Sequence, residues 1–401
     1  MYERFIARQP IFDQRLRVFA YELLFRGGPQ NVFQPRKDAS SSVIVDSTML
    51  FDLQTLTGPA KAFVNADETA ILQGVIKLLP ADRIVVEILE SVSPTPEVVA
   101  ACADLCNSGY VLALDDFVDH PKWQPLLPLA KYLKVDFRAL DRDLCRTTAR
   151  RYLSQGLQLL AEKVETQSEV DDARGMGYSY FQGYFFCKPI MVEGRDIPGN
   201  KLNYVRLLAA VNTDSFDFEK IESILKQEPS LVYKLLRYLN SPLLGLRNRV
   251  RSISHAISLI GEKEFRRWVS IVALVSMAGD KSPELIRTAL TRAYFCEEMS
   301  DSVGLSPQKS DLFLMGLLSV TDAILDLPMS NVVSYLPLSA EVHTALCGGA
   351  NRFREIYDTF LSYERADWKN LSSLAARIGC PEDRAPECYL SAADRATVVS
   401  V

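Results

Sequence analysis

Acidic and amide side chains end one apolar run after another in the first half of the chain. They are Asn65, Glu87, Asp115 with Asp116, Asp136 and Glu162. Carboxylate and amide oxygens are hard ligands of the kind that Mg²⁺ and Mn²⁺ prefer. The 3 histidines and 8 cysteines are scattered and do not make a zinc site of the usual spacing. The residue types therefore favour magnesium or manganese chemistry.

Two of these acids, Asp115 and Asp116, are adjacent, which suits a carboxylate that bridges two metal ions. A pair of ions activates water and stabilises both the attacking and the leaving oxygen of a phosphoryl displacement. We therefore expect phosphodiester hydrolysis. A single acid at a strand end more often caps the following helix. Repetition at successive strand ends, beside Lys134, favours a site, because clustered like charges repel unless cations neutralise them.

The apolar runs that carry these residues alternate with helical stretches, which is typical of a parallel α/β fold. A short polar turn at 13–15 joins the first two runs and predicts a hairpin. About eight strands predict a small, trimmed α/β barrel with an antiparallel first strand, whose strand ends converge on one face. An open sheet is the alternative. The expected strands are Phe5–Phe12, Leu16–Leu24, Ala60–Asn65, Arg83–Ile88, Tyr110–Asp115, Tyr132–Val135, Leu157–Leu160 and Tyr178–Phe186.

The second half of the chain has a different pattern. A polar stretch with Gly and Pro at 193–200 predicts a linker. Beyond it, apolar residues recur at three- and four-residue spacing, which predicts helices. We expect a barrel domain over residues 1–195 and an all-α domain over 196–401. Helical patterns cover Phe218–Gln227, Leu231–Leu239, Ser254–Ile260, Phe265–Ala278, Pro283–Met299, Ser310–Leu318 and Arg354–Tyr363, and the polar tail from Cys380 predicts no function.

The composition excludes several classes of protein. The 401 residues are 48% hydrophobic and 24% charged, which is typical of globular chains with two or three domains. A net charge of −5 argues against binding to a nucleic-acid polymer. No apolar run reaches the ~20 residues of a membrane span, and the N-terminus lacks an apolar signal sequence. We therefore expect a cytoplasmic protein without membrane contact.

Motifs over about residues 4–190 resemble the EAL domain family in the family's order. They are Tyr21-Glu22-Leu23-Leu24-Phe25-Arg26, in which Leu23 replaces the alanine, Val64-Asn65, Val86-Glu87-Ile88-Leu89-Glu90, Leu114-Asp115-Asp116-Phe117, Lys134-Val135-Asp136, Ala161-Glu162-Lys163-Val164-Glu165-Thr166 and Gln182-Gly183-Tyr184. The resemblance implies a TIM-like barrel that hydrolyses the bacterial messenger cyclic di-GMP to linear pGpG.

The resemblance also implies a role for each matching residue. One Mg²⁺ or Mn²⁺ would be held by Glu22, Asn65, Glu87 and Asp115, and a second by Asp115, Asp116 and Glu162. Lys134 would orient or polarise the attacking water, with Glu162 as candidate general base. The remaining matches would contact substrate (Gln9, Arg26 and Gln182) or support loops (Glu90 and Glu165).

Two departures from the EAL pattern bear on activity. Phe117 is followed by Val118-Asp119-His120-Pro121-Lys122-Trp123 in place of a Gly-Thr-Gly loop, and Lys163 replaces a glycine. A glycine there can serve a backbone conformation that lysine tolerates less well, and ligands misplaced by ~1 Å can cost two orders of magnitude in rate. The alternatives to hydrolysis are a degenerate EAL domain that binds cyclic di-GMP or a protein partner without turnover, and a scaffold blind to nucleotide.

The second half resembles the HDOD family over roughly residues 200–330. The resemblance rests on Leu231–Pro242, Ser254–Gly261 and Phe265–Trp268. It implies an HD-like helical domain without metal ligands, acting as an output module for an unknown protein partner. The sequence has no His-Asp dipeptide, and Ser319-Val320 follows Leu314–Leu318 where an HD enzyme continues with His-Asp. We therefore expect no catalysis there. We also expect a structural role for His255. A homodimer is the candidate assembly of the chain.

Overall fold

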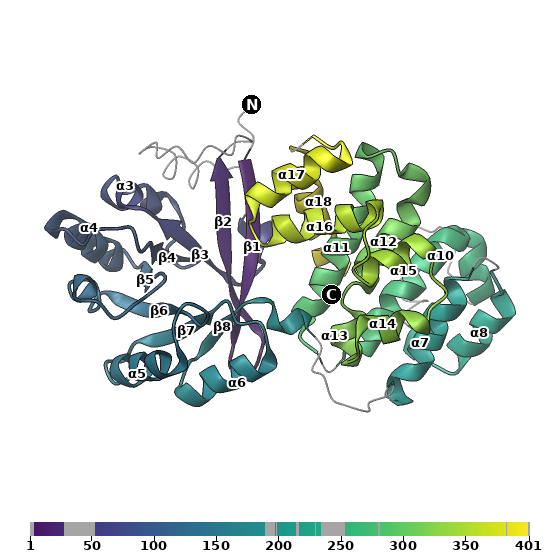
Figure 1. Ribbon diagram of the computed structural model, residues 1–401, viewed down its shortest axis with the longest axis horizontal. Helices are drawn as coiled ribbons and strands as arrows, with labels where there is room; N and C mark the ends of the chain where they lie inside the picture. The colour runs from purple at the N-terminus through teal and green to yellow at the C-terminus, as the bar shows by residue number, and fades with distance from the viewer. Residues whose placement is uncertain are drawn as a thin grey trace. The chain divides into compact units, whose positions relative to one another are not determined.

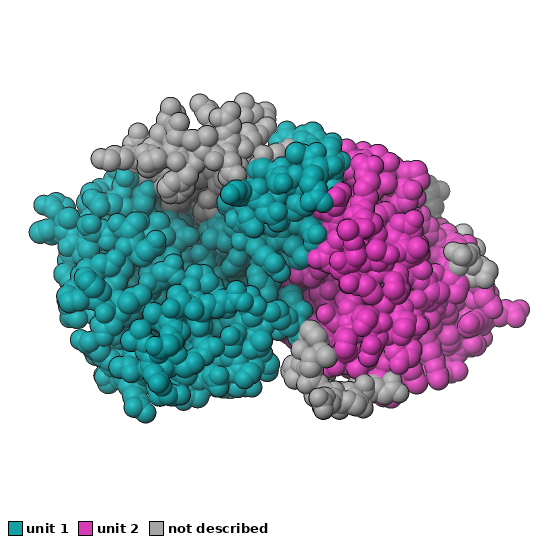
Figure 2. All heavy atoms as spheres, viewed as in Figure 1, with its two compact units in different colours: residues 1–188, 358–399, 401 teal, residues 189–357, 400 magenta. Residues whose placement is uncertain are grey.

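The computed structural model describes residues 4–27, 53–188, 197, 199–213, 216–228, 230–233, 253–279, 281–381 and 383–399. The chain forms two compact units (Figure 2), one of residues up to 188 together with 358–399, and one of residues 189–357. The expected linker at 193–200 lies largely outside the described residues, as does most of Leu231–Pro242.

Eight strands close into a barrel in chain order, which confirms the barrel over the open sheet (Figure 1). The first strand is antiparallel to both of its neighbours, and the other neighbouring pairs are parallel. The strands are β1 Arg4–Asp13, β2 Val18–Gly27, β3 Lys61–Ala66, β4 Ile84–Ile88, β5 Val111–Leu114, β6 Ala130–Asp136, β7 Gln158–Glu162 and β8 Tyr180–Gln182.

The last strand is shorter than the sequence predicts. It ends at Gln182, and Tyr184–Cys187 form a 3₁₀ turn, η3. Gly183 between them has φ +145°, and a Cβ there would lie 2.0 Å from the carbonyl oxygen of Val164. Only glycine fits such a close backbone approach. The strand therefore ends at Gln182, whose polar side chain lies at the end of the barrel.

Side chains inside the barrel form an apolar layer below a polar one. Successive residues of a strand point to opposite faces, so residues two apart share the interior. The apolar layer is a separate core cluster, distinct from the larger core between the strands and the outer helices. Its members are Ile11, Ala20, Phe63, Val85, Ala113, Tyr132 and Leu160, with Tyr180 packed against them.

Short helices cover the outside of the barrel, and residues other than the strand-end acids cap them. The helices are α2 Leu53–Thr57, α3 Glu68–Leu72, η1 Val75–Leu78, α4 Pro96–Asn107, η2 Pro121–Trp123, α5 Arg142–Leu153 and α6 Gln167–Met176. The side chains of Asp67, Thr95, Asp141 and Thr166 accept hydrogen bonds at the N-termini of α3, α4, α5 and α6. Helix capping therefore does not account for the acids at the strand ends.

The last helices of the chain pack with the barrel. They are α16 Arg352–Glu364, α17 Trp368–Ile378 and α18 Arg384–Val399. Helix α18 contacts β1 and α2, and the buried Tyr363 donates from its hydroxyl to the carbonyl of Ile6 at 3.0 Å. The expected domain boundary near residue 195 stays a prediction. Residues 358–399, expected in the second domain, belong to the same compact unit as the barrel. The tail beyond Cys380 is a packed helix.

The unit of residues 189–357 is helical throughout its described part, as the sequence predicts. Gly316 lets two of its helices, α11 and α12, approach closely, since a Cβ there would lie 2.5 Å from the carbonyl oxygen of Arg292. No helix in the described ranges of the chain is both long and apolar enough to span a membrane. The helices of this unit are α7 Gly199–Val211, α8 Phe218–Lys226, α10 Ile253–Met277, α11 Pro283–Ser302, η5 Ser306–Gln308, α12 Lys309–Leu318, α13 Thr321–Leu325, α14 Met329–Ser334 and α15 Ala340–Leu346.

Candidate active site

The polar layer of the barrel takes one residue from each of seven strands and Asp115 from the position directly after β5. Each of these residues lies two positions from an apolar residue of the layer below, because alternate residues face the interior. The layer consists of Gln9, Glu22, Asn65, Glu87, Asp115, Lys134, Glu162 and Gln182. The structure thus brings together eight of the twelve residues that the sequence proposes for the site.

Lys134 is the centre of this layer. Its ammonium nitrogen lies 2.5 Å from Glu87, 2.9 Å from Asp115, 2.9 Å from Glu162 and 3.3 Å from Glu22. The Lys134 side chain is only 1% exposed. Burial opposes its charge, but the surrounding carboxylates outweigh burial and hold the pKa of Lys134 well above its usual range.

Two amide side chains complete the layer through Glu22. The Gln182 amide nitrogen donates to Glu22 Oε2 at 2.6 Å and lies 3.3 Å from Gln9 Oε1. The Asn65 amide nitrogen donates to Glu22 Oε1 at 3.4 Å. Both carboxylate oxygens of Glu22 therefore accept hydrogen bonds from residues of other strands, which fixes the orientation of this side chain.

The buried acids outnumber the lysine that neutralises them. Burial raises the pKa of Glu162 to about 8, with further contributions from Asp115 and Glu22. Burial and the nearby Glu22 raise the pKa of Glu87 well above its usual range, against the opposing effect of Lys134. Several buried oxygens have no hydrogen-bond partner, namely Asn65 Oδ1, Glu87 Oε2, Glu162 Oε2 and Gln182 Oε1. Buried oxygens without partners are costly, and this set fits divalent cations.

A second acidic group lies beside the first. Among the residues that the structure describes, Glu90, Asp115 and Asp116 are the one set of acids whose oxygens lie within 4.8 Å of one another in a manner able to hold a metal ion. Burial and Asp115 raise the pKa of Asp116. The sequence assigns Glu90 to loop support, whereas the structure places its carboxylate with the two aspartates. Glu162, expected beside Asp116, pairs with Lys134.

The loop after Phe117 is held in place despite its departure from the EAL pattern. Phe117 donates from its backbone to Lys134 O at 2.7 Å. Asp119 accepts 2.6 Å hydrogen bonds from the side chains of Arg151 and Tyr152 on α5. Lys122 donates from its ammonium to the carbonyl of Glu90 at 2.7 Å. These side-chain contacts anchor the loop that carries Asp115 and Asp116.

Lys163 is the residue near the site whose role the sequence does not predict. Its backbone has φ +56°, in the left-handed region, as expected for a position that favours glycine. Its ammonium nitrogen lies 2.5 Å from Asp136 Oδ2 and 3.6 Å from Asp116 Oδ1. The signal in the sequence was the placement of a lysine directly after a candidate ligand, but its contacts with two other strand ends required the fold.

Two domain families match successive parts of the chain, and two relatives match nearly its whole length. Residues 5–189 match the EAL domain and residues 197–329 the HDOD domain. The cyclic di-GMP phosphodiesterase CdgJ of Vibrio cholerae is 32% identical over 384 residues, which are 94% of this chain and 89% of that protein. The Bacillus subtilis protein YuxH is 33% identical over 398 residues, 97% of each chain.

The chain belongs to the EAL–HDOD family. A solved structure, Klebsiella pneumoniae BlrP1 in complex with calcium and cyclic di-GMP, is 21% identical, with a TM-score of 0.40 over 46% of this chain and 55% of that one.

Two further residues proposed for the site are Glu165 and Arg26. Glu165 pairs with Arg138 and, at 2.7 Å, with Lys188. The hydrogen bond from Lys188 is the main cause that lowers the pKa of Glu165. This arrangement agrees with the loop-support role, which stays a prediction. The side chain of Arg26 lies outside the described residues.

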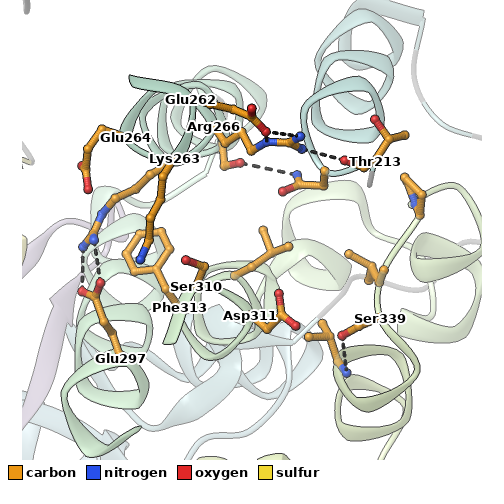
Figure 3. A pocket seen from close by; sticks show the side chains of 17 residues that line it. Thr213, Glu262, Lys263, Glu264, Arg266, Glu297, Ser310, Asp311, Phe313 and Ser339 are labelled. Atoms are coloured by element: carbon orange, nitrogen blue, oxygen red, sulfur yellow. Dashed lines mark hydrogen bonds and ion pairs between the residues drawn. The ribbon is translucent and has the colours of Figure 1, made fainter. Parts of the chain in front are cut away.

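The HDOD half contains a cavity of about 990 Å³ (Figure 3). Arg267 on one side makes a bidentate ion pair with Glu297 at 2.6 and 2.8 Å. Arg266 on another side pairs with Glu262 and donates to the Thr213 carbonyl. Each arginine is thus neutralised by a glutamate, and Lys263, Glu264 and Asp311 also line the cavity. The expected role of His255 falls outside the described side chains.

Proposed function

We propose that the EAL barrel hydrolyses cyclic di-GMP to linear pGpG with two Mg²⁺ or Mn²⁺ ions. Membership of the EAL–HDOD family supports this proposal, as does the name of the relative CdgJ. The observation that carries it is the polar layer, in which four carboxylates surround one lysine and buried oxygens remain without partners.

The residues that would hold the first ion are Glu22, Asn65, Glu87 and Asp115. The second would be held by Asp115 and Asp116 together with Glu90 or Glu162. Bound divalent ions supply a nucleophilic water and neutralise charge on the phosphodiester. The unpartnered oxygens of Asn65 and Glu87 support this assignment, since a cation would satisfy them.

The protein's own groups supply proton transfer and orientation. Glu162 Oε2 has no partner, so Glu162 would be the general base that accepts a proton from the attacking water. Lys134 holds four carboxylates at fixed distances and orients the nucleophile. Gln9, Arg26 and Gln182 would contact the substrate at the rim.

The decisive experiment is hydrolysis of cyclic di-GMP followed by chromatography, with Mg²⁺ or Mn²⁺, for the wild type and Glu22→Ala. We expect pGpG from the wild type and none from the variant, because Glu22 joins the lysine, both amides and the first ion. Glu97→Gln on α4 is the matched control, since Glu97 is exposed on the surface. Failure of every tested divalent ion to support hydrolysis by the wild type would contradict the proposal.

A second function is binding of cyclic di-GMP without turnover. The observation that favours it is Lys163, which holds a left-handed backbone and contacts Asp116. Calorimetry with cyclic di-GMP separates the possibilities when no product forms. A micromolar isotherm supports a degenerate EAL domain, and its absence supports a scaffold that does not recognise nucleotide. Robust turnover eliminates both.

For the HDOD half we propose a non-catalytic module that binds a protein partner. The described residues of this half contain no group of acids, histidines or cysteines able to hold a metal ion. The sequence adds the absence of a His-Asp dipeptide anywhere in the chain. Homodimer formation and a cytoplasmic location remain predictions.

A further inference from the structure

Asp136 holds the ammonium group of Lys163 in a fixed place. Asp136 Oδ2 lies 2.5 Å from the Lys163 nitrogen, and the other oxygen of Asp136 accepts backbone hydrogen bonds from Arg138 at 2.7 Å and Ala139 at 3.0 Å. Because Asp136 is itself restrained by the turn after β6, it is a rigid anchor for the lysine. The charge of Lys163 is thus tied to a defined position although half of its side chain is exposed.

That position is next to one of the two candidate ion sites. The Lys163 nitrogen lies 3.6 Å from Asp116 Oδ1. Asp116 belongs to the set of three acids, with Glu90 and Asp115, whose oxygens lie close enough to share an ion. An ammonium group at this distance attracts the carboxylate and repels a divalent cation that would bind the same carboxylate.

The ligands of the other candidate ion site lie beside a different positively charged side chain, that of Lys134. Glu22, Glu87 and Asp115 contact the buried Lys134, and the ion pairs of Lys163 involve Asp116 and Asp136. The two sites therefore differ in their electrostatic surroundings. Lys163 acts on the Asp116 side, so removal of its charge should change the affinity of the ion held there and leave that of the other ion unchanged.

We propose that Lys163 is a positioning residue whose ammonium group weakens ion binding at Asp116. The inference rests on the proposed metal-dependent function and adds a residue that sets the affinity of one of its two ions. An ion bound by Asp116 must displace the lysine or approach it.

The test is a titration of the full-length, metal-free protein with Mn²⁺, without nucleotide. Electron paramagnetic resonance of free Mn²⁺ measures the number of bound ions, and calorimetry measures their affinities. The variants are Lys163→Gln, which removes the charge, and Lys163→Arg, which keeps it. Lys163→Asn is a second neutral variant, because asparagine accepts the left-handed backbone. Lys188→Gln is the matched control, since Lys188 is similarly exposed and pairs with Glu165 at 2.7 Å.

In the wild type we expect two bound ions. The dissociation constant of one of them should fall at least fivefold in Lys163→Gln and Lys163→Asn, while Lys163→Arg and Lys188→Gln keep the wild-type pattern. An unchanged dissociation constant of the other ion in each variant shows that the barrel is folded.

Three outcomes would overturn the inference. Equal two-ion binding in the wild type and both neutral variants would leave the proposed function standing and remove the role of Lys163. An equal gain in Lys188→Gln would show a general effect of surface charge rather than a specific one. Absence of Mn²⁺ binding in every protein would contradict the proposed function as well.

Discussion

At the scale of single residues, the EAL site depends on the balance between one lysine and several buried acids. Lys134 neutralises part of the charge of four carboxylates and is itself buried. The oxygens that it leaves unpartnered point to additional cations. This charge balance makes Lys134 important for stability, and it makes buried acids such as Glu162 bind protons when no metal ion is present.

Replacement of Lys134 by methionine should abolish hydrolysis and destabilise the metal-free barrel. Breaking a buried ion pair by removing one partner costs about 3–5 kcal/mol, and we expect the loss of activity to be at least 100-fold. Urea unfolding in EDTA measures the first effect, and pGpG formation measures the second. Lys131→Gln is the control, because Lys131 is exposed on the same strand. Wild-type stability of Lys134→Met in EDTA would contradict this role.

The stability of the metal-free protein should fall as the pH rises from about 5 to 8. Burial raises the pKa of Glu162 to about 8 from 4.5, so the folded protein binds a proton that the unfolded chain releases in this window. The free energy of unfolding contributed by this group is complete below the unfolded pKa and is lost as the pH rises through the folded pKa. The slope from one proton is at most about 1.4 kcal/mol per pH unit.

Urea unfolding in EDTA at several pH values measures this slope. Glu162→Gln should flatten the slope, because the amide cannot release a proton. Mn²⁺ should raise stability most at high pH, where the site is deprotonated. A slope that is identical in the wild type and Glu162→Gln would assign the pH dependence to other groups.

At the scale of elements, the barrel depends on a contact with helices far along the chain. Tyr363 of α16 is fully buried, packs against Trp368 and Tyr389, and donates to the carbonyl of Ile6 in β1. Tyr184, the first residue of η3 after β8, donates to the carbonyl of Glu364 at 2.9 Å. These bonds connect α16 to β1 and to the turn that follows β8, and β1 and β8 pair where the barrel closes.

Substitution of Tyr363 by phenylalanine should lower the free energy of unfolding by about 1–2 kcal/mol, because the Ile6 carbonyl loses its donor. Tyr363→Ala should cost about 3–5 kcal/mol, since it also leaves a cavity. Tyr233→Phe, at a tyrosine that is 66% exposed, should have almost no effect. Chemical denaturation of the full-length chain measures all three. Equal stability of Tyr363→Ala and the wild type would show that this contact does not support the barrel.

At the scale of the whole molecule, both ends of the chain build one compact unit. Residues 358–399 group with the barrel although the HDOD match ends at residue 329. The buried face of α18 consists of small and aromatic residues. They are Ala385, Cys388, Tyr389, Ala392, Ala393 and Ala396. Residues 358–399 therefore belong to the same compact unit as the barrel, and Leu390 of α18 packs against the barrel's hydrophobic core.

A chain that ends at residue 357 should retain the eight strands and every proposed site residue, yet lose stability in the barrel. Removal of α17, α18 and most of α16 exposes apolar surface of β1 and α2, and burial of apolar surface stabilises by roughly 25 cal/mol per Å². We expect aggregation or unfolding at a lower urea concentration, measured by light scattering and denaturation. A chain ending at residue 399 is the control. Unchanged denaturation of the shorter chain would contradict this role for the last helices.

The sequence by itself predicted eight strands, of which the last is shorter than expected, and the acids and amide that end several of them. Asn65, Glu87, Asp115 and Glu162 each follow an apolar run, which is a local property of the sequence. Gln9, Glu22 and Gln182 were assigned to the site only through the EAL resemblance. The sequence also predicted the antiparallel first strand, because the hairpin turn is local.

The tertiary structure decided the contacts between distant segments. Neither the attachment of the Lys163 ammonium group to Asp136 nor the packing of Tyr363 on Ile6 leaves a periodic signal, since each pair is separated by many residues and brought together only by folding. The motif match gave Glu90 a role in bracing the loop after Asp116, and only the fold shows that its carboxylate lies with those of Asp115 and Asp116. Local patterns specify which face a side chain takes, whereas barrel closure and helix packing determine which side chains meet.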